Sequence, residues 1–274
     1  MPSVLVTGAA RGIGKAIAVG LAADGWDVIA GVRTEADAAA VSATPRVSAV
    51  LLDVTDDQQL AALSEALPAR LDAVVNNAGV VVGGPLESLS TNDLRRQFDV
   101  NVVGQLAVTQ AVLPRLRQSR GRIVFISSVN GRIATPIIGA YCASKFALEA
   151  AADALRMELR PWHIRVSVVE PAQTATDMWD LAEDTADEFE QAMTPEQRVL
   201  YAKHVAGFRK MIPLSRKLAV PPDRVAAVVR KALTARRPRA RYAVGTAPKV
   251  QIVAMRNLPT AVADIALRKT FGQP

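Results

Sequence analysis

The first two-thirds of the chain alternates short apolar runs, rich in β-branched residues, with longer segments of helical periodicity. The runs with strand character are Ser3–Thr7, Asp27–Gly31, Arg46–Leu52, Ala73–Asn76, Arg122–Ser127 and Arg165–Val169. Several are apolar at nearly every position, as expected of strands covered by helices on both faces. The helical patterns between them fall near residues 13–24, 56–67, 90–117 and 140–160. This alternation predicts an α/β fold with a doubly wound parallel sheet.

After Pro171 the alternation gives way to a charged segment and then to further helices. Asp177–Glu190 carries seven acidic residues around four large apolar ones, which predicts an amphipathic helix with its carboxylates in water. A helix near 222–236, a last strand at Arg241–Val244 and a helical tail broken by Pro259 complete the pattern. We therefore expect a single domain over residues 1–274, with a core at 3–170, an inserted helical lid at about 172–220 and a C-terminal tail at about 246–274.

A glycine-rich turn, Thr7-Gly8-Ala9-Ala10-Arg11-Gly12-Ile13-Gly14, connects the first strand to the first helix. Gly8 permits a tight turn, Gly12 lets the backbone approach a pyrophosphate, and Gly14 lets the helix pack close to the sheet. The N–H groups and positive dipole end of that helix favour an anion. The spacing is G-x-x-x-G-x-G rather than G-x-G-x-x-G, but its place between strand and helix predicts a Rossmann-like dinucleotide site.

The end of the second strand indicates which dinucleotide binds. A site selective for NAD(H) places a carboxylate there to bind the ribose 2′-hydroxyl. This chain has Val32 and Arg33 instead, and Asp27 lies at the other end of the strand. The guanidinium groups of Arg33 and Arg11 suit a 2′-phosphate, whereas the alternative makes Arg33 an ordinary solvated loop residue. We expect NADP(H) to be preferred over NAD(H).

A second group of residues predicts chemistry beside this turn. Ser128 follows an apolar strand, at the carboxyl edge where open α/β sheets bind ligands. Tyr141 and Lys145 begin the next helical pattern four residues apart, so they share one helix face. A Tyr-x-x-x-Lys pair alone is common on helix surfaces. Together with Ser128 and the glycine-rich turn, it predicts a catalytic site.

These motifs resemble those of the short-chain dehydrogenase/reductase family, and the match runs from Val4 to about Met178. The later segments look most like its steroid and retinol dehydrogenase-like branch. Asn101 stands at the family's active-site asparagine, and Ala172 replaces the usual glycine after Pro171. The resemblance implies a cofactor-binding set of Gly8, Arg11, Gly12, Ile13, Gly14, Arg33, Asp53, Val54, Asn77, Ala78, Gly79, Tyr141, Lys145, Pro171, Thr174 and Thr176.

The resemblance implies an oxidoreductase that interconverts a carbonyl and an alcohol. Ser128 is expected to donate a hydrogen bond to the substrate oxygen, and Tyr141 to exchange a proton with it. Because a free tyrosine has a pKa of about 10, we expect Lys145 and the oxidised nicotinamide to favour its ionised form. Lys145 is also expected to hold the nicotinamide ribose, and the backbone of Asn101 a water in a proton relay. The alternative is a catalytically silent NADP(H)-binding regulatory protein, although such proteins usually lack the Tyr or the Lys.

The family likeness places the substrate between the Ser128–Tyr141 loop and the segment after Pro171. An apolar pocket is expected there, although some of its residues could simply be core. The likeness to the steroid and retinol branch implies a lipophilic ketone or secondary alcohol, with Asp177–Glu190 as a lid that orders on binding. Small residues on the helix near 140–160 permit close helix packing. The resemblance implies a homodimer or homotetramer formed through this helix and the one near 90–117, although a monomer stays open. The residues expected to line the pocket are Ile133, Pro136, Ile137, Ile138, Met178 and Trp179.

The basic residues are concentrated at the C-terminal end, since residues 198–274 hold 17 Lys and Arg against two Asp. Such asymmetry can mark contact with nucleic acid or an anionic membrane. Here the basic residues are interleaved with Pro, Gly and apolar positions, so we expect a solvated face or a subunit contact. Without a basic recognition helix or a run of stacking aromatics, no nucleic acid partner is expected. Contact of the tail with a membrane surface is a lesser alternative.

The remaining features concern location and metal binding. The chain has one cysteine, Cys142, and no basic and apolar leader pattern follows Met1. The longest uncharged stretch, Val100–Pro114, is too short for a membrane span. We therefore expect a cytoplasmic protein. His163 and His204 are too few and too far apart in the sequence for a zinc site, so no metal is expected.

Overall fold

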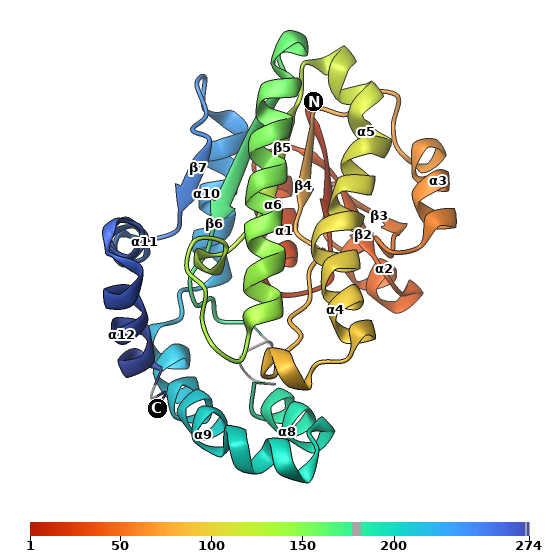
Figure 1. Ribbon diagram of the computed structural model, residues 1–274. Helices are drawn as coiled ribbons and strands as arrows, with labels where there is room; N and C mark the ends of the chain where they lie inside the picture. Colours follow the sequence, from red (N-terminus) through yellow and green to blue (C-terminus); the bar gives the residue numbers. More distant parts are fainter. Residues whose placement is uncertain (177–181, 272, 274) are drawn as a thin grey trace.

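A computed structural model of the chain describes residues 1–176, 182–271 and 273. Within these residues, seven parallel strands form one sheet in the order β3-β2-β1-β4-β5-β6-β7, with helices on both faces (Figure 1). This confirms the predicted doubly wound α/β fold. The strands are β1 (Ser3–Thr7), β2 (Asp27–Val32), β3 (Val47–Leu51), β4 (Ala73–Asn76), β5 (Arg122–Ile126), β6 (Arg165–Glu170) and β7 (Arg241–Ala243).

Alternate residues of each strand enter one of two apolar cores, because successive side chains point to opposite faces. On one face, Val4 and Val6 pack in a cluster that includes residues of α1 and α10. On the other, Leu5 joins a cluster with residues of α3, α5 and α6. All three strand residues have no exposed surface. The helices of this core are α1 (Gly12–Ala23), α2 (Glu35–Ser42), α3 (Asp57–Ala66), α4 (Thr91–Phe98), α5 (Gln105–Ser119), α6 (Gly139–Glu158) and α10 (Pro222–Thr234).

The helix expected near 90–117 is divided into three parts. Between α4 and α5 lies a π-helical segment, η2 (Asp99–Gly104). A Cβ atom on Gly104 would lie only 2.6 Å from the carbonyl oxygen of Val54, so the close approach of two backbones fixes this point. The wider turn places Asn101 in the interior, where it has no exposed surface. A hydrophobic pattern cannot show such a change of helix type, because the apolar period hardly alters.

The C-terminal third adds helices around one end of the sheet and along its β7 edge (Figure 1). The predicted amphipathic helix begins at Ala182, and the rest of that prediction, residues 177–181, lies outside the described residues. Its acids are not all free in water, because Asp187 and Glu190 pair with Arg209 at 2.6 and 2.8 Å. Within the described residues, no helix is long and apolar enough to cross a membrane. The added helices are α8 (Ala182–Ala192), α9 (Pro195–Leu218), α11 (Thr246–Asn257) and α12 (Thr260–Thr270).

Candidate active site

The turn after β1 has a backbone that side chains would distort. Gly8 and Gly12 have φ angles of +63° and +54°, in the left-handed region that L residues rarely adopt. A Cβ atom on Gly14 would overlap the carbonyl oxygen of Gly8, and backbone cannot move aside as a flexible side chain can. The three glycines therefore allow the start of α1 to pack directly against the end of β1.

Hydrogen bonds attach the end of β4 to the same turn. The hydroxyl oxygen of Thr7 accepts from the backbone N–H groups of Asn77 and Ala78, each at 2.9 Å. The Asn77 side chain donates to the carbonyl oxygens of Thr7 and Gly8, at 3.0 and 3.1 Å. Asn77, Ala78 and Gly79 therefore lie between β1 and β4, where the strand order reverses. This is the switch point at which sheets of this kind bind ligands.

The N-terminus of α1 is open to an anion. Among the described residues no side chain caps it and no acid lies in its first turn, whereas α2, α3 and α4 each have a side-chain cap. The methyl group of Thr176 lies 3.2 Å from the place of a Cβ on Gly12, so the segment after Pro171 runs past the turn. Free N–H donors and close backbone approach fit the diphosphate of a dinucleotide.

Two charged residues lie together where β2 and β3 end. Arg33 follows β2 and is exposed, and Asp53 follows β3. Two hydrogen bonds from Thr55, at 2.7 and 2.9 Å, and the charge of Arg33 hold the pKa of Asp53 below its usual value against the effect of burial. The carboxylate therefore stays ionised beside Arg33. Of the other expected cofactor residues, Arg11 is exposed, Ile13 is partly buried, and Val54, Pro171 and Thr174 are buried.

Ser128 and Tyr141 meet at the carboxyl edge of β5. Ser128 caps the short helix η3 (Val129–Gly131), and its Oγ accepts from the N–H of Asn130 at 3.1 Å. Burial raises the pKa of Tyr141, in the first turn of α6, to about 12, although the Ser128 side chain acts on it in the opposite direction. Without the cofactor this phenol is therefore protonated at neutral pH, and the expectation that Lys145 and the oxidised nicotinamide favour its ionised form stays a prediction.

Lys145 lies one turn after Tyr141 on the same face of α6. Its ammonium nitrogen is 5.8 Å from the centre of the Tyr141 ring and donates a 2.8 Å hydrogen bond to the carbonyl oxygen of Ile126. The residue is only 4% exposed, and burial lowers its pKa to about 8 against the opposing charge of Glu149. An amine that changes charge near neutral pH therefore faces the phenol, and the structure brings Ser128, Tyr141 and Lys145 together.

Asn101 supports the loop that follows β4. Its side chain accepts from the N–H of Val80 at 2.8 Å and donates to the carbonyl oxygen of Val80 and the hydroxyl of Ser144, at 3.0 and 3.1 Å. The site of a Cβ on Gly79 is 3.3 Å from the Asn101 oxygen and 3.8 Å from the Lys145 amine. Asn101 thus neighbours α6, and the expected water relay through its backbone stays a prediction.

The loop between Ser128 and Tyr141 packs against the inserted helices. Ile137 is 4% exposed and joins a small apolar cluster with Phe189 of α8 and Val205 of α9. Its φ of +69° is strained for a β-branched residue. Its carbonyl oxygen accepts from the N–H of Gly84 at 2.7 Å, which helps to hold this conformation. The inserted segment therefore fixes the shape of the loop that carries Ser128.

A groove of about 700 Å³ adjoins this loop. Pro136 and Ile137 line it, together with α6, α9 and α12 residues. Neither Ser128 nor Tyr141 is among the described residues that line it. Ile133 is buried elsewhere, and the expected lining residues Met178 and Trp179 lie outside the described residues. Its lining is Pro85, Leu86, Ala134, Thr135, Pro136, Ile137, Gly139, Cys142, Ala143, Phe146, Tyr201, His204, Asp264, Leu267 and Arg268.

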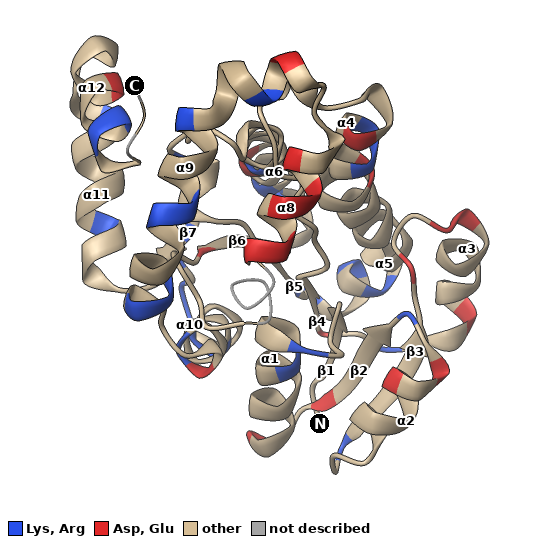
Figure 2. Cartoon of the chain, turned by 90° about the horizontal axis from the view of Figure 1, so that it is seen from below, with Lys and Arg blue, Asp and Glu red and all other residues tan. Residues whose placement is uncertain are grey.

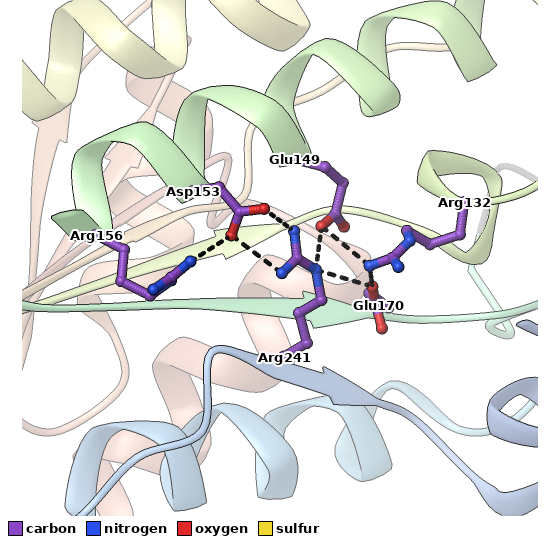
Figure 3. A network of polar contacts seen from close by, with 6 residues as sticks. All are labelled: Arg132, Glu149, Asp153, Arg156, Glu170 and Arg241. Atoms are coloured by element: carbon purple, nitrogen blue, oxygen red, sulfur yellow. Dashed lines mark hydrogen bonds and ion pairs between the residues drawn. The ribbon is translucent and has the colours of Figure 1, made fainter. Parts of the chain in front are cut away.

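Sequence reasoning missed a charged network behind α6 (Figure 3). Arg132, Glu149, Glu170 and Arg241 meet there from four separate segments. Two weak signals were present, since Glu149 follows Lys145 by four residues and Glu170 ends an otherwise apolar strand. Neither signal identifies a partner, because Arg241 is 92 positions from Glu149.

A dinucleotide turn at the switch point, beside a serine, a phenol and a buried amine, defines a class of enzyme. The chain is an NAD(P)-dependent oxidoreductase that acts on CH–OH groups. Known proteins agree, because the family model described as "short chain dehydrogenase" matches residues 2–187. The chain therefore belongs to the short-chain dehydrogenase/reductase family, in its steroid and retinol dehydrogenase-like branch.

Relatives of known name cover nearly the whole chain. Retinol dehydrogenase 5 of Mus musculus is 35% identical over 99% of this chain and 89% of its own. Human 17-beta-hydroxysteroid dehydrogenase type 6 is 31% identical over the same shares. Among solved structures, a Burkholderia phymatum family member in complex with NAD is 25% identical, with a TM-score of 0.78 over 97% of this chain and 95% of that one. A Burkholderia cenocepacia short-chain dehydrogenase in complex with NADP shares the fold at 24% identity, with a TM-score of 0.74 over 100% and 98%.

Proposed function

We propose that this chain is an NADP(H)-dependent dehydrogenase/reductase that interconverts a carbonyl and a secondary alcohol on a lipophilic substrate. The observation that carries the proposal is that the Ser128 side chain acts on the Tyr141 phenol at the end of β5, with the Lys145 amine 5.8 Å from the phenol ring. A hydroxyl pair of this kind can bind one carbonyl oxygen from two directions. The Lys145 amine next to this pair supplies positive charge at the point where the proton is transferred.

In reduction, the Ser128 hydroxyl donates a hydrogen bond to the carbonyl oxygen, where negative charge develops. The phenol of Tyr141 then gives its proton to that oxygen. Its pKa of about 12 favours this direction, because the phenol arrives protonated at neutral pH. In oxidation the phenol must first lose its proton, and a charged Lys145 lowers the cost of that step.

The nicotinamide cofactor would supply the hydride in reduction and accept it in oxidation. Gly8, Gly12 and the N-terminus of α1 are the groups to hold its diphosphate. Arg33 and Arg11 are the groups to hold a 2′-phosphate, and Lys145 the nicotinamide ribose. Asp53, beside Arg33, is the group to lie against the adenine. The remaining members of the set are Ile13, Gly14, Val54, Asn77, Ala78, Gly79, Pro171, Thr174 and Thr176.

The substrate class follows from the relatives named for retinol and hydroxysteroids and from the apolar loop residues. Residues 172–220, with α8 and α9, act in this proposal as the lid over the substrate. A homodimer or homotetramer formed through α6 and the helices near 90–117 belongs to the same proposal, and Ala143 and Ala150 on α6 are exposed. The cytoplasmic location stays a prediction.

The proposal is tested by following NADPH consumption with retinal and with a 17-ketosteroid, with NADH in parallel. We expect turnover with NADPH and a loss of at least about 10³-fold in kcat for Tyr141→Phe, since one general acid contributes about 10²–10⁴-fold. NADPH binding, followed by its fluorescence, should be retained. Tyr242→Phe is the control, because this hydroxyl lies in β7 and accepts from the N–H of Arg239 at 2.9 Å.

Two outcomes would contradict the proposal in different ways. Near-normal turnover by Tyr141→Phe would mean that another group moves the proton. A wild-type protein that binds NADPH but turns over no ketone, aldehyde, quinone or steroid would favour the catalytically silent regulatory protein.

A further inference from the structure

Four charged residues from four segments meet behind α6, and the two carboxylates among them are buried (Figure 3). Arg241 of β7 donates from Nε to Glu149 Oε2 of α6 at 2.9 Å and lies 3.7 Å from Glu170 Oε1 at the end of β6. Arg132, just after η3, lies 3.3 Å from Glu170 and 4.0 Å from Glu149. The Glu149 and Glu170 side chains are only 6% and 5% exposed. At the outer end of the network, Asp153 binds Arg241 and Arg156.

Fold stability alone does not explain this arrangement. Burying charged groups costs several kcal/mol each, and well-packed apolar residues often replace a buried ion pair at no loss. The two carboxylates also repel each other, and with burial this raises the pKa of Glu170 to about 7. In addition, Glu149 Oε1 has no hydrogen-bond partner among the described residues. Buried carboxylates that lower the stability of the fold in this way are expected to have a role beyond packing.

The network lies next to the groups to which the proposed function assigns the chemistry. Glu149 lies one turn after Lys145, and both residues are buried. The position of a Cβ on Gly131 is 3.1 Å from Glu149 Cγ and 3.2 Å from the Lys145 carbonyl oxygen. The helix η3, which Ser128 caps, therefore packs against α6 at both Lys145 and Glu149. Arg132 follows η3 directly, so its ion pairs hold the same segment.

We propose that Glu149 is a positioning residue for the reaction: its buried carboxylate supplies the negative charge that keeps Lys145 an ammonium ion, and Arg132, Glu170 and Arg241 hold that carboxylate in place. The effect of Glu149 on Lys145 agrees with this proposal in direction, since Glu149 raises the pKa of Lys145 against the stronger effect of burial. The charged groups around Glu149 are Lys145 and Asp153 on its own helix, Arg132 after η3, Glu170 on β6 and Arg241 on β7. The inference rests on the proposed function, because it assigns Lys145 its catalytic role.

The test measures Lys145 itself. In the folded protein without substrate, the pH titration of the Lys145 side chain is followed by carbon NMR at the position next to the amine, and Lys145→Arg identifies the signal. Glu149→Gln should lower the midpoint by about one pH unit, since a nearby opposite charge shifts a pKa by about 1–3 units. Asp153→Asn is the matched control. It removes a 2.6 Å ion pair to the same Arg241, but one turn further from Lys145, and should leave the midpoint unchanged.

An equal shift in both variants, or no shift in Glu149→Gln, would overturn the proposal. If Glu149→Gln does not fold, carbon NMR of the Glu149 carboxyl group in the wild-type protein tests the proposal instead. A neutral carboxyl group at pH 7–8 would also overturn the proposal. With retinal and NADPH, Glu149→Gln should lower kcat about tenfold and move its pH profile, with KM for NADPH nearly unchanged. Failure of the proposed function is distinguishable, because it leaves the wild-type enzyme inactive while the Lys145 titration still responds to Glu149.

Discussion

The parts of the chain before and after Pro171 differ in what determines their structure. Before it, the buried strands β1 and β4 carry a site built from backbone contacts of fixed geometry. After it, α8 carries acids and α9 to α12 carry most of the Lys and Arg (Figure 2). Many large apolar side chains are also exposed there. They are Val199, Leu200, Leu214, Leu218, Val250, Val253, Leu258, Val262 and Ile265.

This difference separates two kinds of constraint. At the glycine-rich turn, a single added carbon meets backbone atoms, so few sequences fit and the function depends on them. On α11 and α12, almost every side chain meets solvent, so many sequences fit. A charged link from the second part toward the site is Arg241, whose partners lie on α6 and β6. Substitutions in the two parts should therefore have very different effects.

The largest effect is expected for Gly14→Ala. Its methyl group would overlap the Gly8 carbonyl oxygen, so α1 must move from the sheet, at a cost of about 3 kcal/mol or more. NADPH binding should fall by at least about 100-fold, because 1.4 kcal/mol corresponds to a factor of ten. Urea unfolding and NADPH fluorescence measure both quantities.

Gly20→Ala in the same helix is the control for that change. The nearest atom to its new methyl group is 3.9 Å away, an ordinary contact. Since alanine has the higher helix propensity by about 0.8–1.0 kcal/mol, this variant should be as stable as wild type or more so. Equal losses in both variants would contradict a steric role for Gly14.

The next effect concerns Glu170, whose pKa is raised to about 7 from an ordinary 4.5. Between these values the folded protein holds a proton that the unfolded chain has lost, so this group's contribution to stability is present at pH 4 and is lost as the pH rises to 7. Glu170→Gln cannot lose that proton. As the pH rises from 5 to 8, the unfolding free energy of the variant should therefore increase relative to that of wild type by up to about 3 kcal/mol. A constant difference across this range would contradict the prediction.

These particular residues show what a sequence pattern can predict. The sheet, the turn and the Tyr141–Lys145 pair are encoded by local spacing, so pattern and periodicity were enough. The lowered pKa of Lys145 and the network around Glu149 arise from burial and from contacts across 92 positions, which no local pattern contains. The π-helical segment around Asn101 was missed for a related reason, since a close approach to Val54 determines it.

A smaller effect is expected for Arg33, the residue proposed to select the cofactor, which lies in the part of the chain before Pro171. Arg33→Ala should raise KM for NADPH by roughly 10–100-fold, since a charge-assisted hydrogen bond contributes about 1.5–3 kcal/mol. The KM for NADH should hardly change, because NADH has no 2′-phosphate, so NADH serves as the internal control. A wild-type preference for NADH, or equal losses with both cofactors, would show that Arg33 is only a solvated partner of Asp53.

The smallest effect is expected on the exposed helices, where Val253 of α11 is 56% exposed. Val253→Ser should change the unfolding free energy by less than about 0.5 kcal/mol, as most exposed substitutions do. Val229→Ser in α10 is the matched control, because this valine has no exposed surface and packs in the core with α1, so it should cost about 2 kcal/mol or more. A loss above about 1 kcal/mol for Val253→Ser that grows with protein concentration would show that a second copy covers α11, and the two parts of the chain would then be equally constrained.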